Sequence, residues 1–450
     1  MQVWDGLSGS RIEFNASSAS GSPPEMARLV ENINLQRGLL RQIDKSISAG
    51  ILTLMDKTTV SSISSDADSS SPSSSGWPLL HLSTSQAIRA RLLIGADGPS
   101  SSVRKFSKIE SYGWPYNARA IVATLEHGRA LSPFGTARNH TTAYQRFLPT
   151  GPIAFLPIAP ERASLVWSTT PELAQALLDA GERVLSLMIN AAFRLPDVSI
   201  QYLYRYILEK WGESAVKKSC VVVEELEREV RWREQSHGIV PNSALTSFRR
   251  ADEEEGIPTA DAGMYPPLVH SIQPQSAASF PLRMNHADAY VGNRIALVGD
   301  AAHTVHPLAG QGLNLGIADA EALARIIGRA RLLGGDIGSY TALEGYPHER
   351  YLANHGMLSG VDKLAKLYGT RMKPVVWLRS AGLEVVNEWN GLKEVFMGVA
   401  GAGDNPMGRR GGFPEAAQLP KVGAAVIEGI GGLVDGGRKV LSTALGNLRR

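Results

Sequence analysis

The 450-residue sequence contains almost no cysteine and no long hydrophobic run. Its single cysteine, Cys220, excludes an internal disulfide and a cysteine-based zinc site. No stretch reaches the roughly 18 uninterrupted apolar residues that a membrane-spanning helix needs. The N-terminus, MQVWDGLSGSRIEF, has the pattern of neither a signal peptide nor a transit peptide. With 43% hydrophobic and 20% charged residues, the composition predicts a globular protein with a sizeable core.

Excess positive charge is confined to the C-terminal tail. The net charge is +3, and residues 401–450 contain this whole excess, so the rest of the chain is neutral. A neutral body excludes the basic surface that nucleic-acid binding needs. Apolar residues from Val422 to Leu448 approximate one helical face, which is typical of a helix on an anionic membrane surface. The alternative is a disordered extension, which the many glycines in this segment favour.

The pattern of strands and helices predicts an α/β protein with two domains and C-terminal helices. Helical spacing over 25–47 and a strand pair at Leu79–Ser83 and Arg91–Gly95 belong to a Rossmann-like cofactor domain. Short β-like runs between Ala120 and Ser168 predict an antiparallel substrate domain, followed by helices at 171–193 and 201–211. The parallel pattern returns with a buried strand at 294–300, a long helix from about Gly310, and helices over 340–400.

These patterns give four predicted regions. The cofactor domain occupies 1–112, with a Ser-rich loop at 61–76, and resumes at 291–400. The substrate domain occupies 113–290, with a polar loop insertion at 237–279, and the Gly-rich tail occupies 401–450.

The segment 294–327, RIALVGDAAHTVHPLAGQGLNLGIADAEALARII, carries the strongest chemical signal. Gly299 allows a tight turn after a buried strand, and Asp300 then lies where ligands bind at strand ends in α/β sheets. Gly310 and Gly312 remove side chains where a helix begins, so a ligand can approach its free backbone N–H groups. Asn314 lies on the first turn of that helix. This spacing predicts a site for a nucleotide or flavin.

A second strand end, LLIGADGPSSSVRK at 92–105, repeats the pattern. Asp97 and Gly98 form the turn, Ser100–Ser102 can cap a following helix, and Arg104 lies on that helix within reach of a phosphate or of Asp97. Alone, the segment is equally typical of a capped turn. Two such strand ends about 200 residues apart predict one nucleotide cofactor held by both.

The motifs GADGPSSSVR and GDAAHTVHPLAGQGLN resemble those of single-component FAD-dependent aromatic hydroxylases. Dispersed segments are similar to the ubiquinone-biosynthesis branch: MQVWD, VENINLQRGLL, QRFLPTGPIAFLPI, LVWST and LRSAGLEVVN. The resemblance covers roughly residues 1–400. It implies FAD as the cofactor and hydroxylation of a polyprenylated phenolic substrate with molecular oxygen, through a flavin hydroperoxide.

The same resemblance implies partners, a location and site residues. The electron donor would be of the ferredoxin type or derived from NADPH. Other ubiquinone-biosynthesis proteins would be partners, and the protein would be peripheral to the mitochondrial inner membrane on its matrix side. Cofactor-binding residues are implied at Asn32, Asp97, Gly98, Arg104, Gly299, Asp300, Pro307, Gly310, Gly312 and Asn314. No catalytic side chain and no metal ligand is predicted.

One family feature is missing. No G-x-G-x-x-G occurs in the 450 residues, although this turn normally binds the ADP pyrophosphate. The chain therefore resembles a member without its first βαβ unit, whose absence would leave neighbouring strands unpaired. Two alternatives remain: a non-catalytic component of a quinone-biosynthesis assembly, and a flavin hydroxylase of another aromatic pathway.

Other motifs have ordinary explanations beside functional ones. His303 and His306 could suggest a metal pair, but histidines of a cofactor loop are the favoured interpretation because no third ligand stands out. Four aromatic residues could border a substrate pocket, although core packing is the commoner role of such residues. They are Trp114, Tyr116, Phe147 and Trp167.

Overall fold

The computed structural model describes residues 1–15, 26–65, 76–128, 130–131, 137–138, 141–211, 220–237 and 264–388. Contacts divide the chain into two units. The first consists of Met1–Asn15 and Ala27–Trp389, and it contains nearly all the described residues. The predicted tail at 401–450, including its amphipathic segment, lies outside them.

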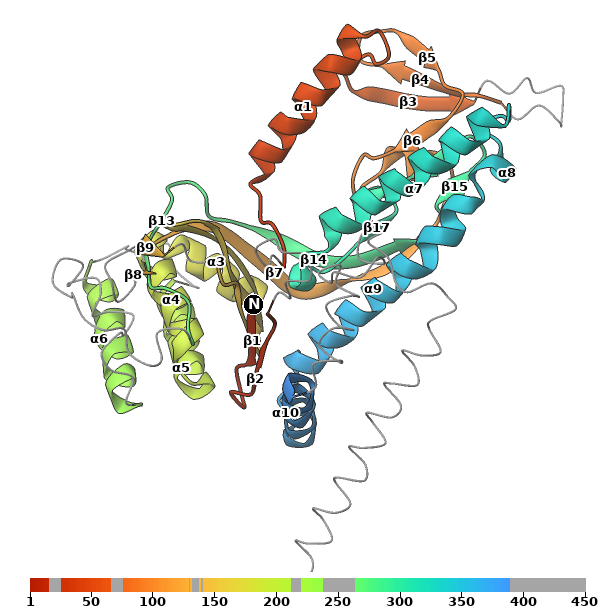
Figure 1. Cartoon of the computed structure of the whole chain (residues 1–450). Coiled ribbons are helices and arrows are strands. Elements are labelled where there is room, and N and C mark those ends of the chain that lie inside the picture. Colours follow the sequence, from red (N-terminus) through yellow and green to blue (C-terminus); the bar gives the residue numbers. More distant parts are fainter. Residues whose placement is uncertain are drawn as a thin grey trace, which may run out of the picture. The chain divides into compact units, whose positions relative to one another are not determined.

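A large sheet forms the centre of the first unit (Figure 1). Its strand order is β17-β14-β7-β12-β11-β10-β1-β2, and β13 also pairs with β7. All neighbours are antiparallel except β1 and β10, which are parallel. The strands are β1 (Gln2–Asp5), β2 (Arg11–Glu13), β7 (Ser111–His127), β10 (Tyr144–Leu148), β11 (Gly151–Ala159), β12 (Arg162–Thr169), β13 (Val269–Ile272), β14 (Ala278–Ala287) and β17 (His303–Thr304). The predicted antiparallel sheet is confirmed.

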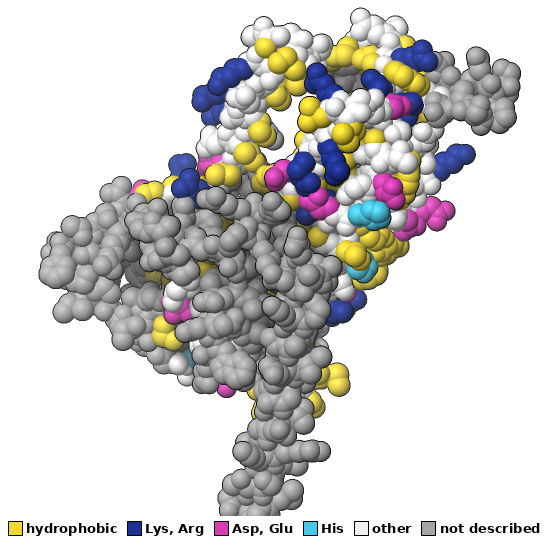
Figure 2. Space-filling model, turned by 45° about the vertical axis from the view of Figure 1, so that its right-hand side comes forward, with side chains coloured by type: hydrophobic (Ala, Val, Ile, Leu, Met, Phe, Trp, Pro, Cys, Tyr) yellow, Lys and Arg dark blue, Asp and Glu magenta, His cyan; other side chains and the backbone are white. Residues whose placement is uncertain are grey.

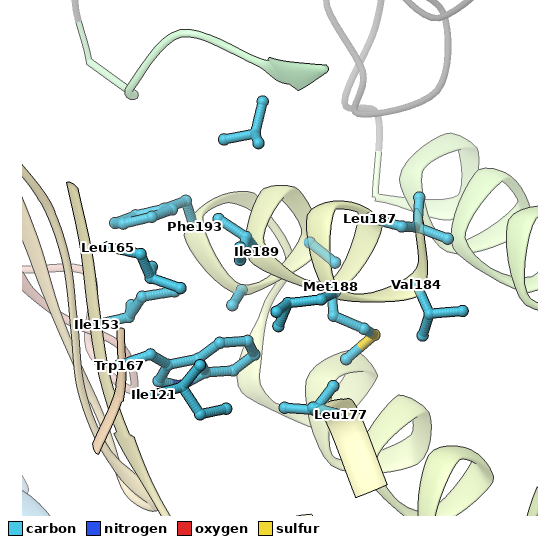
Figure 3. Close-up of a cluster of buried hydrophobic side chains, with 14 of the residues drawn as sticks. Ile121, Ile153, Leu165, Trp167, Leu177, Val184, Leu187, Met188, Ile189 and Phe193 are labelled. Carbon is cyan, nitrogen blue, oxygen red and sulfur yellow. The ribbon is translucent and has the colours of Figure 1, made fainter. Parts of the chain in front are cut away.

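Helices cover one face of this sheet and complete its core (Figure 3). Along β12, Ala163, Leu165 and Trp167 alternate toward the helices and are fully buried, as the period of two in a strand requires. Met188 and Phe193 pack against them from the helical side. The helices are α3 (Pro171–Asp179), α4 (Glu182–Arg194), α5 (Asp197–Trp211) and α6 (Cys220–Ser236). Trp167 is thus a core residue rather than part of a pocket.

A smaller three-stranded sheet, β15-β16-β6, carries the two predicted strand ends. Its strands are β15 (Val291–Gly292), β16 (Ile295–Leu297) and β6 (Leu93–Gly95), and β16 and β6 are parallel. Short helical segments follow these strands: α2 (Ser102–Phe106), η2 (Gly299–Ala301) and η3 (Pro307–Ala309). The helices that follow are α7 (Gly312–Leu332), the short α8 (Tyr340–Leu343), α9 (Gly345–Gly369) and α10 (Lys373–Glu388). Helix α7 packs on η2 and α9 on η3, whereas α10 packs on β2. Parallel strands followed by helices, as predicted, give the mixed α/β fold.

The segment between Asn32 and Arg89 differs from its prediction. Helix α1 (Asn32–Ser48) begins seven residues after the predicted start and has no buried residue. Strand β4 (Pro78–Leu82) pairs with β3 (Val60–Ser65) and β5 (Ala87–Arg89), not with β6. The predicted strand pair is therefore wrong, because the sequence pattern cannot tell which strand edge lies nearby. A further two-stranded sheet joins β8 (Ala130–Leu131) and β9 (Ala137–Arg138).

Four further expectations need correction. Ser61–Ser65 lie in β3, where backbone pairing with β4 tolerates small polar side chains, so the Ser-rich loop is not a loop from its start. Strands β13 and β14 begin within the predicted 237–279 insertion, because the long β7 offers them a backbone edge. Gly181, at φ +89°, divides the predicted 171–193 helix. Strands β1 and β2 belong to the large sheet, although residues 1–112 were assigned to the cofactor domain.

Candidate functional site

The two predicted strand ends lie side by side. In the parallel register of β16 and β6, Leu297 is the partner of Gly95, so the loops that follow leave the same edge of the sheet. Gly98 (φ +79°) and Gly299 (φ +59°) turn these loops in the left-handed region that favours glycine. The structure thus brings together two motifs about 200 residues apart in the sequence.

Asp97 caps the helix that follows the first strand end. Its Oδ2 accepts hydrogen bonds from the backbone N–H groups of Ser102 (2.7 Å) and Val103 (3.2 Å). Partial burial raises the pKa of Asp97, but hydrogen bonds from Ser101 and from these N–H groups outweigh it and lower the pKa below its ordinary value. The carboxylate therefore fixes the shape of this loop.

Arg104 joins the two loops. Its side chain is buried, with Nη1 donating to the carbonyl oxygen of Ala301 (2.5 Å) and Nη2 donating to that of Pro99 (2.8 Å). The guanidinium thus bridges the turn after β6 and the turn after β16. These bonds give Arg104 a structural task, and its binding to a cofactor phosphate stays a prediction.

A buried carboxylate holds the second loop from behind. Asp319, on α7, is fully buried, and its Oδ2 accepts from the backbone N–H of Gly299 (3.1 Å) and contacts Nε2 of His303 (2.5 Å). Its Oδ1 accepts from Arg350 Nε (2.9 Å) and Asn354 Nδ2 (3.0 Å). Burial raises the pKa of Asp319, but the hydrogen bonds from His303, Asn354 and Arg350 lower it overall.

Sequence reasoning missed Asp319, although one signal was available. Leu315, Asp319, Ala322 and Leu323 recur at helical spacing and are all buried. A carboxylate on an otherwise apolar helical face must find cationic or hydrogen-bonding partners. The sequence could have indicated the buried position, but not that Arg350 and Gly299 supply the partners.

A chain of hydrogen bonds continues from this cluster to the surface. Asn354 Nδ2 donates to the Tyr290 hydroxyl (3.0 Å), which contacts Nε2 of His286 (2.9 Å). The other ring nitrogen of His286 contacts the Tyr112 hydroxyl (3.0 Å), which reaches His355 (2.9 Å). Burial lowers the pKa of His286 to about 4, so this ring is neutral at neutral pH. The chain ties α7, α9, β7 and β14 together behind the loop.

Comparisons with known proteins agree with this geometry. The sequence model of an FAD binding domain matches residues 249–359. The mitochondrial ubiquinone biosynthesis monooxygenase COQ6 of Saccharomyces cerevisiae is 36% identical over 405 residues, covering 90% of this chain and 76% of the relative. The chain belongs to the COQ6 family. The human COQ6 protein is 32% identical over 400 residues, covering 89% of this chain and 75% of the relative.

Membership of the COQ6 family makes the chain an FAD-dependent monooxygenase of ubiquinone biosynthesis. Solved structures agree in fold. PqsL of Pseudomonas aeruginosa gives a TM-score of 0.51 at 22% identity, covering 85% of this chain and 80% of the other. The p-nitrophenol 4-monooxygenase PnpA of Pseudomonas putida gives a TM-score of 0.50 at 15% identity, covering 82% of this chain and 71% of the other. These likenesses show the fold alone.

The residues of this COQ6-family chain fit the flavin side of FAD. Helix α7 begins at Gly312, its N-cap residue Gln311 makes no side-chain cap, and its first turn contains no acidic residue. The backbone N–H groups there can therefore donate hydrogen bonds to a ligand with negative charge. Helix α7 approaches the turn closely at Gly316, where an added Cβ atom would lie 3.4 Å from the Cα of Gly299. Asp300, on the same turn, is exposed and can accept hydrogen bonds from hydroxyl groups.

The adenosine side differs. The sequence contains no G-x-G-x-x-G, and in the described part of the chain no strand pairs with the second edge of β6. Ile94 of β6, Ile33 and Leu40 of α1, and Leu313 and Ile317 of α7 are exposed. Figure 2 shows hydrophobic side chains exposed on this part of the molecule. These residues do not form a pyrophosphate-binding turn, so the fit is limited to the flavin side.

The other predicted residues take different positions. Asn32 is the first residue of α1 and is exposed, and the hydrogen bonds that join the two loops do not include it. Pro307 begins η3, and Gly310 ends it at φ +61°. Asn314 is exposed, and its Nδ2 donates to Oε1 of Gln311 (3.2 Å). Contact of each with the cofactor stays a prediction.

His306 closes the loop against the large sheet. Its Nδ1 accepts from the backbone N–H of Leu308 (3.1 Å), and its ring packs edge-on against Tyr116 with 5.0 Å between ring centroids. The Tyr116 hydroxyl donates to Asp362 Oδ1 (2.8 Å). Burial lowers the pKa of His306 to about 4, although the charge of Asp362 opposes this shift. Of the four predicted aromatic residues, Tyr116 thus contacts the motif loop through His306.

Replacing His306 with asparagine is expected to reduce the loss of stability at acidic pH. Since the folded pKa of about 4 lies below the unfolded value of about 6.5, the unfolded state binds the proton first as pH falls. The wild type should therefore lose up to about 3 kcal/mol between pH 6.5 and 4 from this residue, at about 1.4 kcal/mol per pKa unit. The side-chain oxygen of asparagine can still accept the hydrogen bond from the Leu308 N–H group, but asparagine does not titrate. Urea unfolding at pH 7 and 4.5 measures this, and an equal pH dependence of the two proteins would contradict it.

Proposed function

We propose that this chain hydroxylates the benzenoid ring of a polyprenylated ubiquinone precursor. The observation that carries the proposal is the 36% identity to a COQ6 monooxygenase over 90% of the chain, with both flavin motifs joined at one sheet edge. As a monooxygenase, the protein uses molecular oxygen. A donor of the ferredoxin type or one derived from NADPH would supply electrons, and other ubiquinone-biosynthesis proteins would be partners.

The names of the relatives support a proposed location. The COQ6 proteins of yeast and human are named as mitochondrial. Within the described ranges, no helix is long and apolar enough to cross a bilayer. We propose that the protein binds peripherally to the matrix face of the mitochondrial inner membrane, where it can reach a substrate with a polyprenyl tail.

The proposed mechanism assigns tasks to residues of the two loops. Bound FAD supplies the transfer of electrons to oxygen that a monooxygenase requires. The first-turn N–H groups of α7, at Gly312 to Asn314, would stabilise negative charge on the flavin ring. Asp300 would accept hydrogen bonds from ribityl hydroxyls. Arg104 and Asp319 hold the turn that presents Asp300, so these groups stay in place before the ligand arrives.

Replacing Asp300 with asparagine is expected to weaken FAD binding about tenfold to a hundredfold. A hydrogen bond to a charged acceptor is worth about 1.5–3 kcal/mol, and each 1.4 kcal/mol is a factor of ten in affinity. Titration followed by quenching of flavin fluorescence measures the change. Asp179→Asn is the matched control, because this exposed aspartate lies at the end of α3. Equal loss in both variants would argue against a specific role for Asp300.

The function itself is tested with the purified chain and added FAD. We expect a visible flavin absorption spectrum and, with a reductant, a ring-hydroxylated product of a ubiquinone precursor detected by mass spectrometry. A folded but colourless protein would refute the enzymatic function of this chain and favour a non-catalytic component. Growth of a quinone-deficient strain carrying the gene separates ubiquinone biosynthesis from another aromatic pathway.

A further inference from the structure

The end of α9 and the start of α10 form a surface that is both apolar and basic. We call it the α9–α10 surface. Its exposed apolar residues are Leu364, Leu367, Met372, Trp377 and Leu378. Its exposed basic residues are Lys363, Lys366, Arg371 and Lys373. From residue 363 to residue 383 the sequence contains no Asp or Glu. Two of the four cations are in ion pairs with acidic residues outside this range, Arg371 with Asp197 (3.1 Å) and Lys366 with Asp362 (2.7 Å).

The two helices are held together at this corner. The buried Arg379 of α10 donates from Nη1 to the carbonyl oxygens of Leu367 (2.8 Å), Tyr368 (3.2 Å) and Thr370 (3.1 Å). Arg379, the residue after Trp377 and Leu378, therefore joins the start of α10 to the end of α9. Arg379 also forms a buried ion pair with Asp5 (2.9 Å), which anchors the corner to β1. The exposed apolar side chains thus project from a fixed framework.

This surface adjoins the loop of the candidate site. Lys366 forms an ion pair with Asp362 (2.7 Å) and lies 4.6 Å from the centroid of the Trp114 ring. Asp362 accepts the hydrogen bond of Tyr116, whose ring packs on His306. Two side chains therefore separate the α9–α10 surface from the loop that holds Pro307 and Gly310.

We propose that the α9–α10 surface rests on an anionic lipid bilayer and places the flavin loop beside it. Exposed apolar side chains enter the headgroup boundary, and surrounding cations bind anionic headgroups. Trp377, which is 67% exposed, has the amphipathic ring that favours this boundary. The proposal rests on the proposed function, because a polyprenylated substrate must leave the bilayer near the site.

An exposed tryptophan, Trp377, distinguishes this surface from two other exposed apolar regions. Helix α1 and the turn after it also expose apolar residues among charges of both signs, but residues 26–57 contain no aromatic residue. The α7 end exposes Leu332 and Leu333 beside Arg329 and Arg331, but it has no aromatic residue.

Vesicle co-sedimentation of the full chain tests the proposal without any cofactor. Vesicles of phosphatidylcholine alone are compared with vesicles in which about a third is phosphatidylglycerol. We expect the wild type to bind the anionic vesicles, and Met372→Ser/Trp377→Ser to bind them at least tenfold more weakly with an unchanged Tm. Vesicle binding by Lys363→Gln/Lys373→Gln should be weaker than that of the wild type at low salt and should depend much less on the salt concentration.

Leu332→Ser/Leu333→Ser is the matched control, because both leucines are exposed beside arginines. It should bind as the wild type does. Absence of wild-type binding would overturn the proposal. The proposal would also be overturned if Met372→Ser/Trp377→Ser bound the vesicles normally while the control, or Leu39→Ser/Leu40→Ser of α1, lost binding.

Turnover separates this proposal from the proposed function. A short-chain, water-soluble substrate analogue without vesicles tests hydroxylation alone, and Met372→Ser/Trp377→Ser should turn it over like the wild type. The same variant should turn over vesicle-borne long-chain substrate at least tenfold more slowly. No hydroxylation of either substrate by the wild type would refute the proposed function, whereas sedimentation would still decide the membrane surface.

Discussion

Replacing Asp319 with asparagine is expected to lower the free energy of unfolding by about 3–5 kcal/mol, the cost of breaking a buried ion pair by removing one partner. Asp319 is fully buried and pairs with Arg350, which is itself buried. The amide would leave the guanidinium without its counter-charge and would place an N–H group opposite another donor. Urea unfolding at neutral pH measures this change.

The Asp319 effect should depend on pH with a definite sign. The folded pKa is lowered below the unfolded value of about 3.9, so the carboxylate stabilises the fold above that pH. The stabilisation is lost as pH falls through the folded value. The difference between wild type and Asp319→Asn should therefore be complete at pH 6 and should shrink below about pH 4.

Glu349→Gln is the control for Asp319→Asn. Glu349 pairs with Arg325 (2.6 Å), but both side chains are exposed to solvent. Such pairs contribute about 0–1 kcal/mol. If Glu349→Gln lowered the free energy of unfolding as much as Asp319→Asn, burial of the ion pair would not be the cause of the Asp319 effect.

Because Asp319 also accepts a hydrogen bond from the N–H of Gly299, Asp319→Asn should weaken FAD binding, whereas Glu349→Gln should leave FAD binding unchanged.

Replacing Arg104 with methionine is expected to cost about 3 kcal/mol or more of stability, since two hydrogen bonds from a charged donor are lost. Methionine keeps much of the side-chain volume but leaves the carbonyl groups of Ala301 and Pro99 without these donors. The two strand-end loops should then separate more easily. We expect weaker FAD binding as well as a lower urea midpoint.

Lysine at position 104 distinguishes the two roles of Arg104. A lysine retains the positive charge but cannot bridge two carbonyl groups in the fixed geometry of a guanidinium. If Arg104 acts mainly as a bridge, Arg104→Lys should resemble Arg104→Met in both measurements. Near-normal FAD affinity in Arg104→Lys, with poor affinity in Arg104→Met, would instead indicate direct contact of the cation with a cofactor phosphate.

Much of the candidate site could be predicted from local sequence. Gly299 was recognisable because tight turns favour glycine, and Gly310 because a glycine leaves a helix start open to a ligand; both have positive φ. The apolar run before Gly299 correctly predicted a buried strand, and the Gly-rich spacing correctly predicted a helix start, observed at Gly312. These features depend on residues within a few positions of each other.

Strand partners and buried polar contacts could not be predicted in this way. Strand β14 begins within a Pro- and Gly-rich region whose composition is typical of a loop, yet it pairs with β7 over most of its length. The edge of β7 that makes this pairing favourable lies more than 150 residues earlier. Likewise, the β4 edge that pairs with Ser61–Ser65 overrides their weak strand propensity.

The sequence by itself determined the cofactor class, the two glycine–aspartate turns and the absence of a G-x-G-x-x-G turn. Tertiary structure alone decided that Arg104 bridges these turns and that Asp319 supports one of them from within. The physical reason is that turns and caps satisfy backbone groups locally, whereas a buried charge is stable only where distant segments supply its partners.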